Sequence, residues 1–222
     1  MTTLTLVTAC WGTAYSQFIP RWWQGYQSLN RKPDELILGV EKDDLSGLSD
    51  SIPKGVKARI VILPDGDFQE KWEFILAQAT SKWHISIAID DELCPDAFDE
   101  IDAADEAEAE IYIDTILIRG GGKKRGHWDT SNIAVDMPVG GGPATTVELF
   151  KRIGIKKQFR WTDWVFLIDA VKAGVKPYIS NTTRMIYDPG HGRSTWSSVS
   201  MDRAVRQAYC DEVTNYARSL GL

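Results

Sequence analysis

The stretch Trp83-His84-Ile85-Ser86-Ile87-Ala88-Ile89-Asp90-Asp91-Glu92 decides the fold. Apolar and small residues run from Ile85 to Ile89 without the alternation of a strand that has one face in water. This pattern is typical of a strand buried on both faces, as in the middle of a parallel sheet. Acidic residues follow at its carboxyl end, where open α/β sheets bind their ligands.

The adjacent carboxylates of Asp90, Asp91 and Glu92 repel one another, and this repulsion favours a cation between them. Hard divalent ions prefer oxygen ligands. The stretch therefore predicts a metal site that holds a phosphorylated ligand. The alternative is a solvated acidic turn before Pro95.

Length and composition indicate one sizeable α/β domain with its own core, because the chain has 222 residues and is 43% hydrophobic. The net charge of −6 argues against broad, non-specific binding to nucleic acid. Cys10, Cys94 and Cys210 are far apart, which predicts reduced thiols in a cytoplasmic protein. No stretch approaches the ~20 apolar residues of a membrane span.

Strands and helices are predicted to alternate over the first half of the chain. Strands are expected at 3–9, 36–40, 56–63, 85–89 and 111–118, and helices at 18–29, 67–80 and 96–110. The last of these helices is acidic, since seven of the twelve residues from Asp99 to Glu110 are Asp or Glu, and we interpret it as a solvated face.

The segment 120–143 carries two glycine triplets around a basic run, Lys123-Lys124-Arg125, and predicts a lid or an acceptor-binding loop. Helices at 145–153 and 162–173 follow it, with Thr162 as the N-cap of the second. Two short strands are expected at 175–180 and 184–187. A terminal helix from Met201 to Leu220 covers the core or, as the alternative, joins two copies of the chain.

The ends of these elements form an ordered set that resembles the family 2 glycosyltransferases. The set is Ala9-Cys10-Trp11, Glu41, Asp90-Asp91-Glu92, Thr162-Asp163-Trp164 and His191-Gly192-Arg193-Ser194, and the resemblance runs from Leu4 to about Ser194. It implies a GT-A fold, which is an α/β fold with a Rossmann-like, mainly parallel central sheet flanked by helices, here followed by a C-terminal helix. The single domain 1–222 would comprise a nucleotide-sugar-binding part at 1–100, an acceptor-side part at 101–197 and the helix 198–222.

The resemblance also implies how a UDP-sugar would bind. Ala9 and Trp11 would contact the base, Glu41 would hydrogen-bond the uracil edge, and Lys71 would reach the base or a phosphate. Asp90 would touch the ribose. The metal ligands for Mn²⁺ or Mg²⁺ would come from Asp91, Glu92 and His191, with Glu92 standing where the family more often has Asp.

Asp163 matches the catalytic base of the family, although Thr162 stands where an acid is usual. Weaker matches place Arg193, Ser194 and Trp164 at the diphosphate or the acceptor. Other interpretations stay open at this point. In the alternative interpretation, Asp163 is an acid that only stabilises a helix N-terminus, His191 belongs to a surface loop, and the tryptophans are core residues.

The resulting functional prediction is a metal-dependent inverting glycosyltransferase, of the hexosyltransferase type, that moves a sugar from a UDP-sugar to an acceptor hydroxyl. The acceptor is left open between a glycan, a protein, a lipid-linked sugar and a modified nucleobase. One alternative is an inactive nucleotide-sugar-binding protein on the same fold. Another is a nucleotidyltransferase, a class that typically has a glycine- and basic-rich phosphate loop where this chain has Cys10-Trp11-Gly12-Thr13.

Overall fold

The computed structural model describes residues 1–10, 13–44, 57–138, 142–188 and 203–222. Trp11, His191, Arg193 and Ser194 lie outside these residues. The strands are β1 Leu4–Cys10, β2 Glu35–Val40, β3 Ala58–Ile62, β4 Trp83–Ser86, β5 Glu92–Leu93, β6 Ile111–Ile118, β7 Lys123–Lys124, β8 Ala144–Thr146 and β9 Pro177–Tyr187. The helices are α1 Ile19–Ser28, α3 Phe68–Leu76, α4 Ile101–Glu106, α5 Val147–Ile153, α6 Thr162–Lys172 and α7 Arg203–Ser219, with short 3-10 turns at Thr13–Phe18 and Lys42–Asp44.

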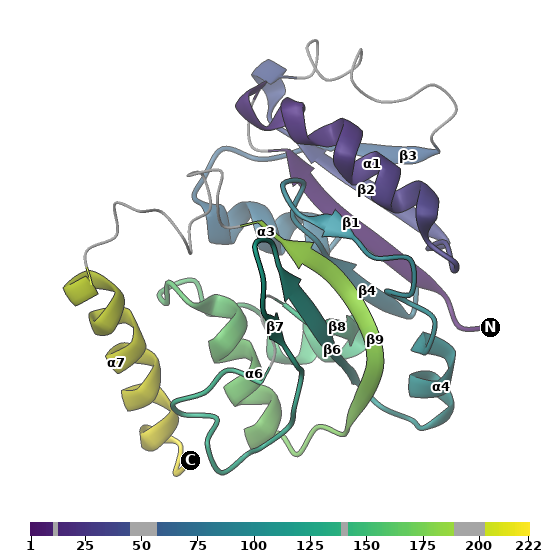
Figure 1. Cartoon of the computed structure of the whole chain (residues 1–222). Coiled ribbons are helices and arrows are strands. Elements are labelled where there is room, and N and C mark those ends of the chain that lie inside the picture. Colours follow the sequence, from purple (N-terminus) through teal and green to yellow (C-terminus); the bar gives the residue numbers. More distant parts are fainter. Residues whose placement is uncertain (11–12, 45–56, 139–141, 189–202) are drawn as a thin grey trace.

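The strands form one curled sheet in the order β3-β2-β1-β4-β8-β6-β9-β5, and β7 pairs with β6 beside this path (Figure 1). The pairs β1–β2, β1–β4, β2–β3 and β6–β9 are parallel, whereas β8 is antiparallel to both of its neighbours. The predicted fold class is confirmed: helices flank a mainly parallel α/β sheet, and a C-terminal helix is present.

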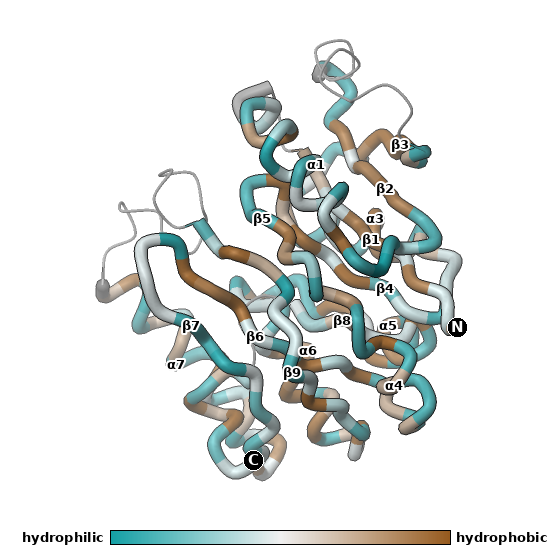
Figure 2. The backbone as a smooth tube through the Cα atoms, turned by 45° about the vertical axis from the view of Figure 1, so that its right-hand side comes forward, coloured by the Kyte–Doolittle hydropathy of each residue, from teal (hydrophilic) through white to brown (hydrophobic). Residues whose placement is uncertain are grey.

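Helices cover both faces of the sheet, so its central strands have no face in water. α1 and α4 pack on one face, together with side chains such as Leu4, Leu6 and Tyr112. α3 packs on Val7 and Ile37 of the other face. α5 and α6 continue that layer over β6, and α7 lies outside α6. Figure 2 shows hydrophobic stretches along β2 and β6 and hydrophilic residues along β7.

Some predicted elements differ from the structure. β4 ends at Ser86, and Ile87 and Ile89 stay buried but belong to a segment that passes into a turn rather than continuing the strand. The acidic helix is only Ile101–Glu106, because acidic side chains before it, such as Asp96 and Glu100, accept hydrogen bonds from β9 instead of extending a solvated face. The two short C-terminal strands are one strand, β9, whose polar bulge interrupts the apolar pattern.

The position of α1 depends on Gly25, the residue at which the helix meets β5. A Cβ atom at Gly25 would lie 2.9 Å from both the backbone N and the backbone O of Leu93. Backbone atoms cannot yield as a flexible side chain can. The glycine therefore lets α1 rest directly on the strand that continues from Asp91.

We expect Gly25→Ala to lower the free energy of unfolding by about 1–3 kcal/mol, because the added methyl overpacks this contact. The gain of about 1 kcal/mol in helix propensity offsets only part of that loss. Urea unfolding would measure the change. Gly142→Ala is the matched control, since a Cβ atom there meets nothing within 4 Å. A Gly25→Ala protein as stable as the wild type would contradict the close approach.

His84 of β4 is a buried histidine that the fold keeps neutral. Its Nε2 lies 2.8 Å from the Thr145 hydroxyl of β8, and its ring meets Phe150 of α5 edge-on. Burial lowers the pKa of His84 from 6.5 to about 4. Between these values the unfolded chain binds a proton that the folded chain does not, so His84 stabilises the fold at neutral pH and this stability is lost as pH falls.

We expect the wild type to lose about 2–3 kcal/mol more stability than His84→Gln between pH 7 and pH 4. Urea unfolding of both proteins at several pH values would measure this difference in slope. Other groups titrate equally in the two proteins and cancel in the comparison. Parallel pH profiles would show that His84 is not the cause.

α7 covers the core of its own chain. Val213 and Ala217 are fully buried, and the Tyr216 hydroxyl donates to Asp169 of α6 at 2.6 Å. The Nζ of Lys156 lies 2.7 Å from the other Asp169 carboxylate oxygen. The alternative, that this helix joins two copies of the chain, stays a prediction. In the described ranges, every helix is too short or too polar to cross a membrane.

Candidate active site

The acidic residues predicted to bind the donor lie at the carboxyl edge of β1, β2 and β4. Asp90 and Asp91 are only 9% and 5% exposed, whereas Glu92 begins β5 and is partly exposed. Burial, and then repulsion from Asp90, raise the pKa of Asp91 to about 7. The Asp91 carboxylate accepts the Asp188 backbone N–H in a long hydrogen bond of 3.4 Å. Burial and the neighbouring Asp90 therefore both disfavour the ionised form of Asp91.

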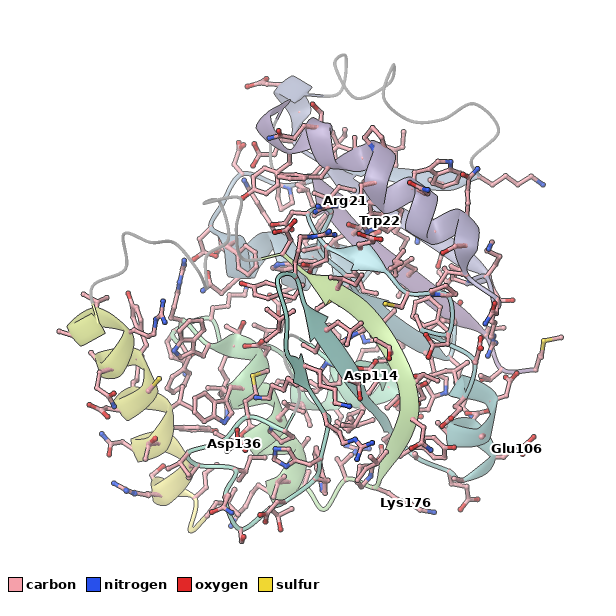
Figure 3. The ribbon with its side chains drawn as sticks, in the orientation of Figure 1. Arg21, Trp22, Glu106, Asp114, Asp136 and Lys176 are labelled. Carbon is pink, nitrogen blue, oxygen red and sulfur yellow. The ribbon has the colours of Figure 1, made fainter. Side chains whose placement is uncertain are left out.

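Two arginines from different elements contact these acids or their neighbour Asp188. Arg21 of α1 forms an ion pair with Asp188 at 2.7 Å and donates to the Asp90 backbone carbonyl. Arg119, just after β6, lies 2.9 Å from the same Asp188 carboxylate and 2.5 Å from that of Glu92. Figure 3 shows Arg21 near the end of β9, where Asp188 follows the strand. We call Arg21, Arg119 and Asp188 the arginine cluster.

A second buried ion pair lies deeper in the sheet. Asp114 of β6 is 0% exposed, Arg184 of β9 is 1% exposed, and the arginine Nε lies 3.3 Å from the Asp114 carboxylate. The arginine also donates to the Gly142 carbonyl. Burial raises the pKa of Asp114 to about 6, although Arg184 opposes that shift.

Asp163 stands in the first turn of α6. The helix begins at Thr162, and Trp161 rather than Thr162 is the N-cap residue, so that prediction was wrong. The Asp163 carboxylate accepts the backbone N–H of Trp164 at 2.9 Å. Burial raises its pKa, and this backbone hydrogen bond, Lys124 of β7 and Arg184 lower it. A carboxylate with a pKa above its ordinary value is a better proton acceptor than an exposed one.

Glu41 and Lys71, predicted to contact the nucleotide, are brought together. Glu41 follows β2 directly and Lys71 lies on α3, and their charged ends form an ion pair at 2.6 Å. α3 is fixed there by a capping box between Asp67 and Glu70. The helix therefore presents Lys71 to the sheet edge that also carries Asp90 and Asp91.

Two other predicted residues point into the core. Ala9 of β1 is fully buried against α3. Trp164 is buried too, and its indole N–H donates to the Ile133 carbonyl at 2.7 Å. The Thr214 hydroxyl of α7 donates to the neighbouring Ala134 carbonyl at 2.8 Å. Trp164 thus anchors the segment after the basic run, and its role at an acceptor stays a prediction.

The donor set fits a divalent cation in part. No group of three His, Cys, Asp or Glu side chains in the described ranges is arranged to hold a metal ion. However, Asp91 presents a buried carboxylate beside a second acid, and Mg²⁺ commonly binds through one or two carboxylates plus the phosphates of a substrate. These residues suit a cation that is shared with a diphosphate.

The sequence interpretation missed Arg21, Asp114, Arg119, Arg184 and Asp188. The sequence does mark Asp114 as unusual, because it is the one acid inside the apolar strand Ile111-Tyr112-Ile113-Asp114-Thr115-Ile116-Leu117-Ile118. An acid in such a run needs a buried partner or a function. The arginines had no local signal, since their partners lie far away along the chain.

A surface groove of about 540 Å³ lies elsewhere, between α3 and α5. Phe74, Phe150 and Lys157 are among the residues that line it, and none of the predicted site residues does. The candidate site is therefore defined by its charged side chains rather than by this groove.

No family model matches the chain, and no curated protein matches it in sequence. Solved structures do match it. S. aureus TarS 1-349 in complex with UDP-GlcNAc has a TM-score of 0.65 at 12% identity, over 97% of this chain and 66% of that chain. The mannosyltransferase PcManGT from Pyrobaculum calidifontis, in complex with GDP-Man and Mn²⁺, has a TM-score of 0.60 at 11% identity, over 99% of this chain and 72% of that one.

The fold is of the GT-A type. Another crystal structure of S. aureus TarS 1-349 gives the same result with a TM-score of 0.64 at 12% identity, over 84% of this chain and 60% of that chain. The chain thus spans about three fifths of that TarS fragment. At these identities the likeness establishes the GT-A fold, and the assignment to family 2 stays a prediction.

Proposed function

We propose that this chain is a metal-dependent inverting glycosyltransferase that moves a sugar from a UDP-sugar to an acceptor hydroxyl group. One observation carries the proposal. Asp91 and Asp163 are both carboxyl groups whose pKa is raised by burial, and the guanidinium of Arg184 opposes that rise in both. The acid suited to the donor phosphates and the acid suited to the acceptor therefore both lie within electrostatic range of one buried arginine in a GT-A fold.

The charges at the donor site support a divalent cation. Asp90, Asp91, Glu92 and Asp188 bring four carboxyl groups to one edge of the sheet. A sugar diphosphate would add further negative charge there. Mn²⁺ or Mg²⁺, held by Asp91 and assisted by Glu92 or His191, would bring positive charge to the diphosphate and stabilise it as it leaves.

Asp163 is the general base in this proposal. As the acceptor oxygen bonds to the anomeric carbon, the bond from that carbon to the β-phosphate oxygen breaks, and the acceptor proton moves to Asp163. One carboxylate is enough for inversion, because the diphosphate leaves as an anion and needs no proton from a second acid. The partial burial of Asp163 raises its pKa, which makes the carboxylate more basic.

The donor base is proposed to lie at Ala9, Trp11, Glu41 and Lys71, with Asp90 at the ribose. The ion pair between Glu41 and Lys71 offers an acceptor and a donor side by side at the sheet edge, which suits the edge of uracil. TarS has been crystallised with UDP and UDP-GlcNAc, and PcManGT with GDP-Man. The choice of UDP over GDP is therefore the part of the proposal that needs a direct test.

The test is calorimetric binding of UDP, CDP, GDP and dTDP, each with Mn²⁺ and with EDTA. We expect UDP to bind most tightly and only with the metal. A panel of UDP-sugars then follows, with release of UDP measured against release of pyrophosphate. If none of the four nucleotides bound, the donor assignment would be refuted. Release of pyrophosphate would indicate a nucleotidyltransferase instead.

The acceptor side is proposed to include residues 101–197, with the basic segment after β6 as the acceptor-binding loop. Arg193, Ser194 and Trp164 are proposed to lie at the diphosphate or at the acceptor. The segment is tied at Ile133 to α6 and at Ala134 to α7. These anchors keep part of it close to Asp163, at the start of α6.

A further inference from the structure

Asp188 brings the two guanidinium groups of the arginine cluster together. Its Oδ2 atom lies 2.7 Å from a terminal nitrogen of Arg21 and 2.9 Å from the Nε of Arg119. The two arginines come from separate elements, α1 and the segment after β6, so the shared carboxylate oxygen is the point at which they meet. Two guanidinium groups that converge on one oxygen form a site for an anion, and in this structure that anion is part of the chain itself.

The arginine cluster is arranged around Asp91, the acid proposed to hold the cation of the donor. Arg21 donates to the backbone carbonyl of Asp90, the residue before it, and Arg119 pairs with the carboxylate of Glu92, the residue after it. The backbone N–H of the third member, the acid, donates to the Asp91 carboxylate. Each member of the cluster therefore contacts Asp91 or one of its two neighbours. A diphosphate that shares a cation with Asp91 would lie within reach of both guanidinium groups.

The two arginines are accessible, whereas the acid between them is largely covered. The side chains of Arg21 and Arg119 are 30% and 42% exposed, and the side chain of Asp188 is 12% exposed. A guanidinium group has five N–H donors, so each arginine can contact a further anion beside its present partner. A ligand in solution can thus reach the positive charges of the cluster more readily than its negative charge.

Holding the fold together is a weak explanation for this cluster. Ion pairs with a partly exposed partner contribute little to stability. The elements that the cluster joins also have other attachments, because α1 rests on β5 at Gly25 and β9 pairs with β6 along most of its length. A site that exchanges one anion for another accounts better for two accessible guanidinium groups beside Asp91.

We propose that Asp188 is an internal anion that competes with the diphosphate of the donor for the guanidinium groups of Arg21 and Arg119. The inference rests on the proposed function, because it places the diphosphate at Asp91. As phosphate oxygens approach, they accept hydrogen bonds from the guanidinium nitrogens that contact the Asp188 carboxylate in this structure, and the carboxylate gives way. The same competition lowers the affinity for the nucleoside diphosphate and so speeds its release after transfer.

The test is calorimetric binding of inorganic pyrophosphate, with Mg²⁺ present, to the full chain and its variants. We expect Asp188→Asn to bind pyrophosphate about fivefold more tightly than the wild type, or more, because a competing charge is removed. Arg21→Gln and Arg119→Gln should each bind it about tenfold more weakly, because a charge-assisted hydrogen bond is lost. Asp102→Asn is the matched control: it changes the net charge equally, but Asp102 belongs to α4 and pairs with Arg31 at 3.1 Å.

The triple variant Arg21→Gln/Arg119→Gln/Asp188→Asn separates competition from simple repulsion. Relative to the double variant Arg21→Gln/Arg119→Gln, it should recover less than about twofold in affinity, because no guanidinium is left to compete for. Recovery of the full gain in this background would overturn the proposal, and so would pyrophosphate binding by Asp188→Asn no tighter than that of the wild type. Arg119→Gln leaves Asp188 paired with Arg21, so it provides the test even where Asp188→Asn does not fold, and unchanged binding by it would also contradict the proposal.

Pyrophosphate carries neither a base nor a sugar, so the proposal about Asp188 and the proposal of sugar transfer can fail separately. Absence of pyrophosphate binding in both the wild type and Asp188→Asn would overturn the first of these proposals and leave the second to the nucleotide panel. Where transfer is measured, Asp188→Asn should also lower the KM for the UDP-sugar and slow the release of UDP.

Discussion

Replacing Asp163 with asparagine is expected to slow sugar transfer by about 10²–10⁴-fold, which is the usual contribution of a general base. The amide oxygen can still accept the Trp164 N–H, so the start of α6 should be unchanged. Because Asp163 is proposed to act on the acceptor, the Kd for UDP and Mn²⁺ should stay within about twofold of the wild-type value. Initial rates of UDP release, with calorimetry on the same samples, measure both quantities.

Glu106→Gln is the matched control for Asp163→Asn. Glu106 is an exposed acid of α4, and Figure 3 shows it on the outer side of that helix. Its loss should change neither the rate nor the binding. Transfer by Asp163→Asn within tenfold of the wild-type rate would show that another group takes the proton. Asp114 would then be the first residue to test, as a buried carboxylate of raised pKa near Arg184.

Replacing Asp91 with alanine is expected to remove the effect of metal on nucleotide binding. With Mn²⁺ present, the Kd for UDP should rise by about 100-fold or more, because a carboxylate ligand and its charge are lost together. With EDTA present, the variant and the wild type should bind UDP equally weakly. Calorimetry with and without Mn²⁺ measures this loss.

Glu92→Gln distinguishes the two candidate metal ligands. The Glu92 carboxylate is already paired with Arg119 at 2.5 Å, whereas Asp91 has no comparably short partner among the interactions of the described residues. We therefore expect a smaller loss of UDP binding for Glu92→Gln than for Asp91→Ala. Equal losses would indicate that both acids hold the cation, and undiminished binding by Asp91→Ala would refute its role.

The pattern of apolar residues was sufficient to predict the longer strands of the sheet and most of its helices, whereas the short strands β5, β7 and β8 were not predicted. Strands buried on both faces, such as β1 and β2, leave a continuous apolar run that has few other interpretations. Because Asp90 and Asp91 directly follow such an apolar run, the same pattern placed them at the carboxyl edge of the sheet. β9 was predicted as two strands because Asn181, Thr182 and Thr183 look like a loop in sequence. Only the partners of Asn181 and Thr183 in the turns before α4 show that this stretch is a bulge.

The predicted site was incomplete for a similar reason. Arg21 and Asp188 are 167 positions apart, so no local pattern connects them. A basic residue on an amphipathic helix is by itself an ordinary surface residue. The roles of Ala9, Trp11, Glu41, Lys71, Asp90, Asp91, Glu92, Asp163, Trp164, His191, Arg193 and Ser194 stay predictions, and the experiments above test the main ones.

β9 also sets the order in which the protein can mature. β1, β2, β3 and β4 can pair as soon as the first 86 residues have been synthesised, because all their parallel partners are already present. β9 pairs with β6 and β5, and Asp188, at its end, pairs with Arg21 and Arg119. Pairings so distant along the chain form slowly. A nascent chain should therefore acquire the sheet of β1 to β4 first, and the complete set of charged groups around Asp188 only after β9 has left the ribosome.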